Sequence, residues 1–175
     1  QQLYKVNNLI LLVNDTVKNA KVVKLRNNLA SFNKIKTNFL SDINEIQKHI
    51  TGDYLAIINP GNYYGPNYLH DYSLSFLYHN EGKLFGKNTY FSQINDDLKL
   101  ENCGHEFVFT SRVLTSTLVV RKEIAKKINY LDLLQSEWYE GPSKENEILS
   151  LDRYNFLKVV ASDNIDEEFC KKIIN

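Results

Sequence analysis

The 175-residue sequence contains no methionine, three prolines and only two cysteines, Cys103 and Cys170. It has no CxxC pair and no cluster of cysteines and histidines, which excludes a disulfide framework and a cysteine-based zinc site. No apolar run approaches the roughly 18 residues that a membrane-spanning helix needs. The N-terminus lacks the zones of a signal peptide. We therefore expect a cytoplasmic chain with reduced thiols, either processed or taken from a longer polypeptide.

Motifs of several common enzyme classes are also missing. The sequence has no GxGxxG, no GxxxxGK[ST] and no GxSxG. A Rossmann site, a P-loop and a hydrolase nucleophile are not predicted, because the glycines of these motifs are required sterically. The four histidines never recur at the i, i+4 spacing that places two metal ligands on one helical face. We predict no metal site and no resident cofactor.

An excess of one charge is missing as well. The formal net charge is zero, so no global field attracts nucleic acid, and we expect no nucleic-acid partner. Residues 1–50 carry eight Lys or Arg and three Asp or Glu, whereas residues 131–175 carry five and ten. This asymmetry indicates either two ends that solvate themselves or face each other, or a basic cleft for a phosphate ligand.

Short apolar runs alternate with helical patterns in the first half of the chain. Three runs are typical of buried strands: Leu9–Val13, Val22–Leu25 and Asp53–Ile58. Helical spacing of apolar residues predicts one helix over 38–50 and another from Gly65 to Gly82. This order predicts an α/β protein with a mostly parallel sheet flanked by helices.

The second half of the chain changes to short β-rich pieces. We interpret four of them as antiparallel additions to the sheet: Leu84–Phe85, Tyr90–Phe91, Phe107–Phe109 and Thr117–Val120. The patterns further predict a short helix over 122–128, an irregular segment over 136–146 and a strand over 155–160. A C-terminal helix is predicted over 163–175, with acids in its first turn and lysines in its last. At this length we expect a single domain, 1–175, with a buried core.

Three local features carry side chains suited to chemistry. Asp15 follows the first predicted strand, where its carboxylate either contacts a base or ribose or caps the turn. His105 and Glu106 precede a predicted strand, as an acid/base pair or as an ordinary surface pair. Tyr63, Tyr64 and Tyr68 either stack on a sugar or base or cover the start of a helix.

Three segments resemble family 2 glycosyltransferases with the GT-A fold. The central one is 52–69, in which Gly52-Asp53-Tyr54-Leu55-Ala56-Ile57-Ile58 leads through a loop to Tyr63-Tyr64-Gly65-Pro66-Asn67-Tyr68-Leu69; the others are 116–122 and 152–156. Their order and spacing are similar to those of bacterial cell-surface polysaccharide and teichoic acid enzymes, and the likeness covers 9–160. The resemblance implies a nucleotide-sugar donor, a divalent cation held by an acidic DxD-type loop, and an aspartate in a Glu-Asp pair as base.

The sequence departs from that pattern where the chemistry of the family lies. Relatives have consecutive aspartates where the uncharged Asn59-Pro60-Gly61-Asn62 stands here. Asn59, Gly61 and Asn62 are therefore degenerate metal-loop positions, because magnesium needs one or two carboxylates besides the phosphates. Glu137 matches the glutamate of the pair, but Trp138 occupies the place of the base. Asp15 matches a nucleotide-contacting aspartate only loosely, since the chain starts too late for a full copy of the nucleotide cup.

These departures lead to the first functional expectation. We expect a glycosyltransferase-like domain that is no longer catalytic and serves as a binding or assembly module in bacterial surface-polymer synthesis. Its expected partners are a catalytic transferase module or subunit, a nucleotide sugar or a glycan. Its expected place is the cytoplasm or the inner face of the bacterial membrane.

Two other interpretations stay open. One is a metal-independent transferase, in which Arg112 or Arg121 replaces the cation and Glu137, Glu140 or His105 is the base. The other is a carbohydrate-binding module that uses the tyrosine-rich loop.

Overall fold

A computed structural model describes residues 8–12, 36–40, 45–79, 82–94, 97–142 and 147–160. Residues 8–12 and 36–40 are described by their backbone alone. Asp15, the strand predicted over 22–25 and the helix predicted over 163–175 lie outside the described residues.

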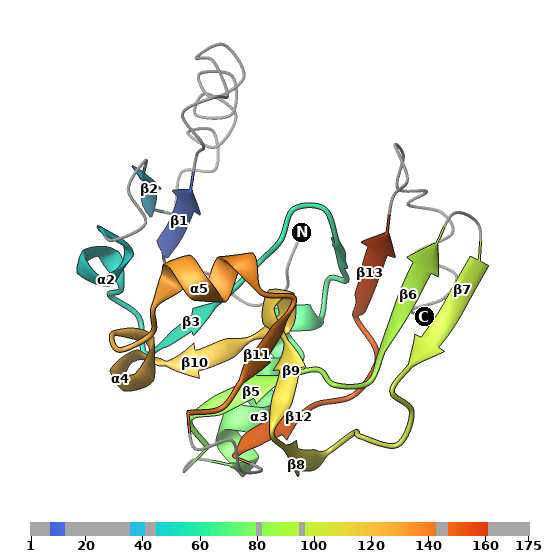
Figure 1. The fold of residues 1–175 in the computed structure, drawn as a ribbon. Helices are drawn as coiled ribbons and strands as arrows, with labels where there is room; N and C mark the ends of the chain where they lie inside the picture. Colours follow the sequence, from blue (N-terminus) through green and yellow to red (C-terminus); the bar gives the residue numbers. More distant parts are fainter. Residues whose placement is uncertain are drawn as a thin grey trace.

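A five-stranded mixed sheet lies at the centre of the described part (Figure 1). Its order is β3 (Tyr54–Ala56), β10 (Val119–Arg121), β5 (Leu84–Gly86), β12 (Ile148–Ser150) and β8 (Val108–Thr110). Strand β10 is antiparallel to both β3 and β5, whereas β12 is parallel to β5 and antiparallel to β8. Strands β3, β5 and β12 therefore run in one direction and end at the same edge.

A four-stranded sheet lies beside the central one (Figure 1). Its order is β4 (Tyr63–Tyr64), β13 (Phe156–Val160), β6 (Tyr90–Ile94) and β7 (Asp97–Glu101). Strand β13 is parallel to β6, and the other pairs are antiparallel. Two further pairs are the antiparallel ribbon of β9 (Arg112–Leu114) and β11 (Trp138–Glu140), and the parallel pair of β1 (Asn8–Leu12) and β2 (Lys36–Leu40).

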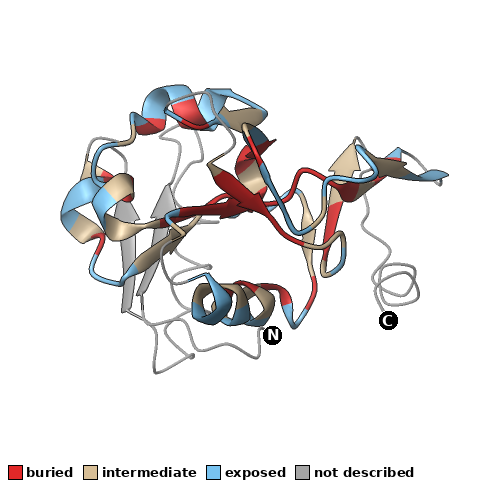
Figure 2. Ribbon diagram, turned by 90° about the horizontal axis from the view of Figure 1, so that it is seen from below, coloured by how far each residue is buried: buried red, intermediate tan, exposed pale blue. Residues whose placement is uncertain are grey.

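Each face of the central sheet has its own hydrophobic cluster. Successive residues of a strand point to opposite faces, so Leu84 and Phe85 of β5 belong to different clusters, as do Val120 and Val119 of β10. Buried residues are concentrated in these central strands (Figure 2). The sheet is thus covered on both faces.

Helices cover the two faces unequally. Three short helices contribute to the cluster that contains Leu84: α2 (Ile46–His49), α4 (Lys122–Ala125) and α5 (Tyr130–Gln135). The other face packs against α3 (Tyr68–Tyr78), whose Tyr68 and Tyr72 are buried one turn apart. Tyr72 places its hydroxyl 2.6 Å from Thr117 O and donates a hydrogen bond to it. This bond satisfies a polar group that α3 brings into the core.

The mixed α/β class is confirmed, together with several predicted elements. The strands predicted at 9–13, 53–58 and 155–160 correspond to β1, β3 and β13. The helices predicted at 65–82 and 122–128 correspond to α3 and α4, both shorter than predicted.

The prediction of a mostly parallel sheet is wrong. Strand β10, predicted as an antiparallel addition, is antiparallel to both of its neighbours, but it lies between β3 and β5. Strand β5, also predicted as an addition, is the central strand. An apolar run indicates burial and carries no information on strand direction or order.

Two local predictions also need correction. The helix predicted over 38–50 is a strand at its start, because 36–40 form β2 and only 46–49 are α-helical. The segment 136–146, predicted as irregular, contains strand β11. Short apolar patterns fit strand and helix alike, and tertiary pairing decides between them.

Candidate functional site

One edge of the central sheet collects five segments of the chain. The segments 57–62, 87–89 and 151–155 follow β3, β5 and β12, while 115–118 and 105–107 precede β10 and β8, which run the opposite way. In open α/β sheets ligands bind outside the carboxyl ends of the parallel strands, and β3, β5 and β12, which share one direction, all end here. This edge, called the carboxyl edge below, is therefore the candidate functional site.

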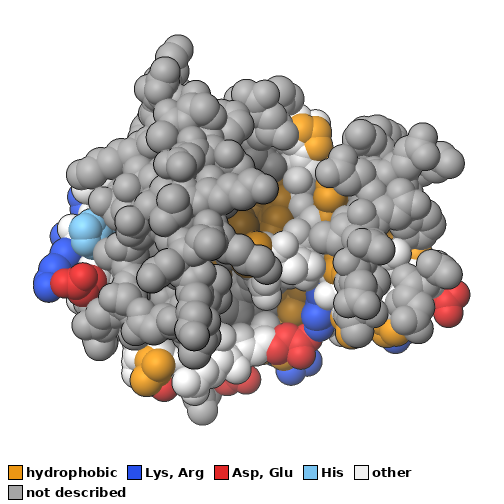
Figure 3. Space-filling model, turned by 90° about the horizontal axis from the view of Figure 1, so that it is seen from above, with side chains coloured by type: hydrophobic (Ala, Val, Ile, Leu, Met, Phe, Trp, Pro, Cys, Tyr) orange, Lys and Arg blue, Asp and Glu red, His pale blue; other side chains and the backbone are white. Residues whose placement is uncertain are grey.

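The face seen from above Figure 1 includes the side on which the loop after β3 lies. In that view, the coloured side chains of the described residues mix acidic, basic and hydrophobic types (Figure 3). No single sign of charge dominates among the described side chains on this face, in line with the neutral composition.

The loop 59–62 is closed by its own hydrogen bonds. Asn59 Oδ1 accepts a hydrogen bond from Gly61 N at 2.9 Å, and Asn59 O accepts one from Asn62 N at 3.0 Å. Asn62 Oδ1 accepts one from Val159 N at 3.2 Å. The side-chain oxygens at two degenerate metal-loop positions are thus engaged by backbone N–H groups, and Gly61 has no side chain to offer.

Tyr64 joins this loop to the segment before β10. Its hydroxyl accepts a hydrogen bond from Asn59 N and donates one to Ser116 O, both at 2.9 Å. Its ring lies 4.8 Å from that of Tyr68 and 5.4 Å from that of Phe156, between centroids. Burial raises the pKa of Tyr64, so the hydroxyl keeps its proton. Tyr64 supports the loop, and these contacts limit the ring surface available for stacking.

Of the other two predicted stacking residues, Tyr68 is buried in the core and Tyr63 is half-buried. Strand β4 places Tyr63 opposite Leu157 of β13 in the smaller sheet. Tyr63 and Tyr64 therefore anchor the end of the loop to β13.

Two ion pairs hold the segment 151–155. Lys87 Nζ lies 3.1 Å from Asp152 Oδ1 and 2.5 Å from Asp152 O. Arg153 N and Nε donate to Glu106 Oε1 at 2.9 and 2.8 Å, and Arg153 Nη2 donates to Glu106 Oε2. Hydrogen bonds from Arg153 hold the pKa of the Glu106 carboxyl below its usual value. The carboxylate predicted to pair with His105 is therefore bound to Arg153.

Asn155 ties the same segment to the residue after β4. It has a left-handed φ of 58°, its carbonyl accepts a hydrogen bond from Gly65 N at 2.9 Å, and its Nδ2 donates to Asp71 Oδ2 at 2.8 Å. Burial, with a smaller contribution from Asp152, raises the pKa of Asp71. A Cβ at Gly65 would lie 2.6 Å from Asn155 Oδ1 and 3.2 Å from its Cα, so this close approach requires glycine.

Glu137 lies just before β11 and pairs with a lysine from the smaller sheet. Its carboxylate forms an ion pair with Lys158 of β13, and its backbone O accepts a hydrogen bond from Thr115 N at 2.9 Å. Lys158 precedes Val159, whose N–H is bonded to Asn62 of the loop. The pair therefore stands beside the uncharged loop.

Lys158 is the functional candidate that the sequence interpretation missed. The available signal was a lysine inside the otherwise apolar strand Phe156-Leu157-Lys158-Val159-Val160. A charged side chain within an apolar strand needs an oppositely charged partner or contact with solvent. That the partner of Lys158 is Glu137 depends on tertiary structure and could not be predicted.

The two arginines considered as replacements for a cation have other partners. The Arg112 guanidinium lies 4.8 Å from the centre of the Trp138 ring. Arg121 Nε donates to Tyr54 OH at 3.2 Å, and the register of β10 with β3 places Arg121 at the start of β3. Arg121 is thus at the opposite edge from the loop.

His105 is exposed, and its backbone N–H donates to Thr89 Oγ1 at 3.1 Å. In the described part of the chain, the contacts of His105 and of Glu137 go to different segments. The structure therefore gives no contact that pairs these two predicted catalytic residues.

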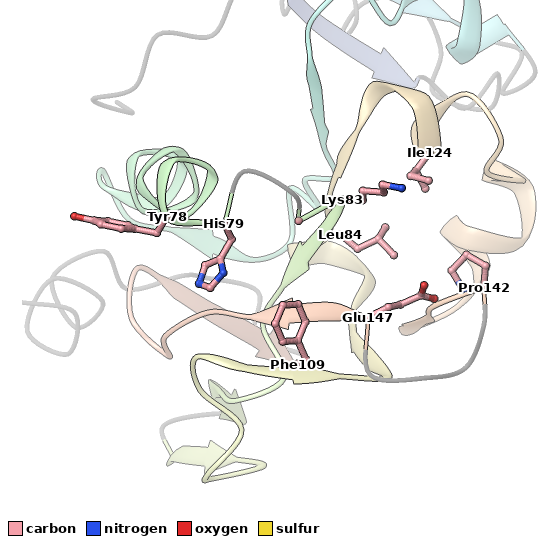
Figure 4. Close-up of a pocket in the computed structure, with 9 residues that line it drawn as sticks. Tyr78, His79, Lys83, Leu84, Phe109, Ile124, Pro142 and Glu147 are labelled. Atoms are coloured by element: carbon pink, nitrogen blue, oxygen red, sulfur yellow. The ribbon is translucent and has the colours of Figure 1, made fainter.

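A hollow lies at the opposite edge of the central sheet from the carboxyl edge. It is a pocket of about 430 Å³ near the starts of β5 and β12, lined by Tyr78, His79, Gly82, Lys83, Leu84, Phe109, Ile124, Pro142 and Glu147. The His79 ring points toward Phe109, and their centroids lie 6.2 Å apart (Figure 4). No residue of this pocket was predicted as a site from the sequence.

The described ranges contain no group of three or more His, Cys, Asp and Glu side chains arranged to hold a metal ion. No helix within these ranges has the length and apolar character needed to cross a membrane.

The sequence matches no protein-family model and no curated protein.

Proposed function

We propose that this chain is a GT-A-type, glycosyltransferase-like domain that binds a nucleotide sugar or glycan without transferring it. In this proposal it is a binding or assembly module of bacterial surface-polymer synthesis, in the cytoplasm or at the inner membrane face, beside a catalytic transferase.

The meeting of the three resembling segments supports this proposal. Segments 52–69, 116–122 and 152–156 are far apart in sequence, yet Tyr64 OH bonds to Ser116 O and Gly65 N bonds to Asn155 O. A ligand at the carboxyl edge would lie close to all three. This is the position that ligands take in α/β sheets.

The composition of the loop 59–62 is the main observation that supports a domain without transferase activity. A magnesium ion beside a sugar diphosphate is held by one or two carboxylates and the phosphates. The loop offers amides instead, and the Oδ1 atoms of Asn59 and Asn62 already accept backbone hydrogen bonds. Losing the cation costs about 10² to 10⁴ in rate when nothing replaces it.

A metal-independent transferase is the second candidate, and one contact favours it. Lys158 provides a cation beside the loop, and its partner Glu137 provides a carboxylate that can act as base. In this alternative Lys158 stabilises the leaving diphosphate. This role was assigned to Arg112 or Arg121 from the sequence.

Isothermal titration with uridine and cytidine diphosphate sugars tests the proposal, with magnesium, with manganese and with a chelator. We expect binding that is independent of the metal, and no release of nucleotide during prolonged incubation. Micromolar binding that requires a divalent cation would overturn the proposal. Metal-independent binding together with nucleotide release would select the second candidate.

A further inference from the structure

A row of polar side chains crosses the smaller sheet next to the loop. Lys158 of β13 is in register with Ser92 of β6, and Ser92 is in register with Lys99 of β7. Register partners share one face of a sheet, and each strand step is about 4.8 Å, so the Cα atoms of the two lysines lie about 10 Å apart. Two lysine side chains at this separation can reach one anion between them.

Each ammonium group in this row is held by a nearby carboxylate. Lys99 Nζ lies 3.3 Å from Glu101 Oε1, which also accepts a hydrogen bond from Ser92 Oγ at 2.9 Å. Lys158 is paired with Glu137 from the neighbouring ribbon. In each pair one partner is largely exposed and the other mostly covered: the Glu137 side chain is 55% exposed and Lys158 24%, while Lys99 is 67% exposed and Glu101 25%. Ser92, between the two lysines, is buried. Because one partner of each pair stays in contact with water, an anion of higher charge can compete with the carboxylate for the ammonium group.

Buried polar groups lie beneath and beside the row. Burial raises the pKa of Tyr90 to about 12, with smaller contributions from Glu101 and Glu137. Thr115, whose N–H bonds to Glu137 O, is 6% exposed, and its hydroxyl has no hydrogen-bond partner among the described residues. A buried hydroxyl without a protein partner calls for an explanation, and an enclosed water beside Glu137 would supply one.

We propose that Lys158, Ser92 and Lys99 form a binding site for a diphosphate group, and that Glu137 and Glu101 hold Lys158 and Lys99 as competing carboxylates while the site is empty. The ligand must outcompete a carboxylate already in place. A diphosphate, which carries several negative charges over a few ångströms, can contact both ammonium groups, whereas a second carboxylate gains little over Glu137. This inference deepens the proposed function, on which it rests only for the source of the diphosphate.

The proposal predicts opposite effects for the two partners of the ion pair. Isothermal titration with inorganic pyrophosphate at low salt compares the wild type with Lys158→Gln and Glu137→Gln. Lys158→Gln removes a charge-assisted contact and is expected to weaken binding at least tenfold. Glu137→Gln removes the competitor and is expected to tighten binding about threefold. Lys158→Arg keeps the charge and is expected to bind within threefold of the wild type.

Controls come from the opposite edge of the sheet. Lys126→Gln and Glu123→Gln make the same charge changes at exposed positions on and just after α4 and are expected to leave pyrophosphate binding unchanged. Melting temperatures check that each variant is folded, and Lys158→Arg separates loss of charge from loss of structure.

Several outcomes would overturn the site. They are no binding of pyrophosphate by the wild type at millimolar concentration, weaker binding in Glu137→Gln, or acetate or dimethyl phosphate binding as tightly as pyrophosphate. Pyrophosphate has no nucleoside, so this result is separate from the fate of the proposed function. If pyrophosphate binding depends on Lys158 but no nucleotide sugar binds, the site is supported and the proposed function is wrong.

Discussion

Lys87 Nζ lies 3.1 Å from Asp152 Oδ1, and the lysine side chain has no exposed surface. Burial lowers the pKa of Lys87, and the Asp152 carboxylate opposes this lowering. The Asp152 side chain is 20% exposed. The partners therefore differ in their access to water, and this pair fixes the segment 151–155 to the end of β5.

Removing either partner should destabilise the protein, and to different extents. Asp152→Ala leaves a buried ammonium that cannot reach water, so we expect a loss of about 3–5 kcal/mol in the free energy of unfolding. Lys87→Met leaves a carboxylate that is partly hydrated, so the expected loss is smaller, about 1–3 kcal/mol. Urea unfolding measures both. Asp53→Ala, at an exposed aspartate before β3, is the control, and equal losses in Asp152→Ala and this control would contradict the argument.

Tyr64→Phe tests the support of the loop. The substitution removes the acceptor of Asn59 N and the donor to Ser116 O while keeping the ring. We expect a loss of about 1–3 kcal/mol in the free energy of unfolding, because two hydrogen-bonding groups lose their partner. Hydrogen exchange of the Asn59 amide should accelerate. Tyr78→Phe, on a side chain that is 82% exposed, should change neither quantity, and an unchanged Asn59 exchange rate in Tyr64→Phe would exclude this role.

Replacement by alanine should have opposite effects on stability at Gly65 and at Gly52. At Gly65 a Cβ meets Asn155 Oδ1 at 2.6 Å and its Cα at 3.2 Å, so we expect Gly65→Ala to cost about 1–3 kcal/mol. At Gly52 the nearest atom is 3.5 Å away and φ is not positive, so Gly52→Ala should be neutral or stabilising by up to about 1 kcal/mol. Thermal unfolding compares the two variants. Equal stability of Gly65→Ala and Gly52→Ala would show that Asn155 can move away from the added Cβ without loss of stability.

The sequence predicted those parts of the fold that follow from local pattern. Strand β3, helix α3 and strand β13 have long enough runs or clear enough spacing to be recognised, and they frame the loop 59–62. The position of β10 between β3 and β5 could not be predicted, because pairing partners are chosen by the whole fold. The same limit explains β2, whose Phe39 fits a helical pattern although the segment pairs with β1.

The candidate site was predicted only in outline. The uncharged loop and Glu137 were identified as departures from a family pattern, and both lie at the carboxyl edge. Their contacts are with residues distant in sequence. Lys158 is 21 residues from Glu137, and Asn62 accepts a hydrogen bond from the backbone of Val159, 97 residues away. Local spacing holds no information on contacts at such separations. The pairing of Glu106 with Arg153 was missed for the same reason.

Glu106 should make part of the stability depend on pH. Hydrogen bonds from Arg153 hold its pKa below the usual value, so the folded state binds its proton less readily than the unfolded state. The stabilisation is therefore present above the ordinary glutamate pKa of about 4.3 and is lost as pH falls through the lower folded value. We expect Glu106→Gln to lower the free energy of unfolding by about 1–2 kcal/mol at neutral pH. The difference from wild type should shrink as the pH falls through this lower folded value, because wild-type Glu106 then becomes protonated. Urea unfolding across this range measures it, with Glu123→Gln, at an exposed site on α4, as the matched control. If Glu106→Gln stays less stable than wild type by the same amount as the pH is lowered, the stabilisation does not depend on the charge of Glu106.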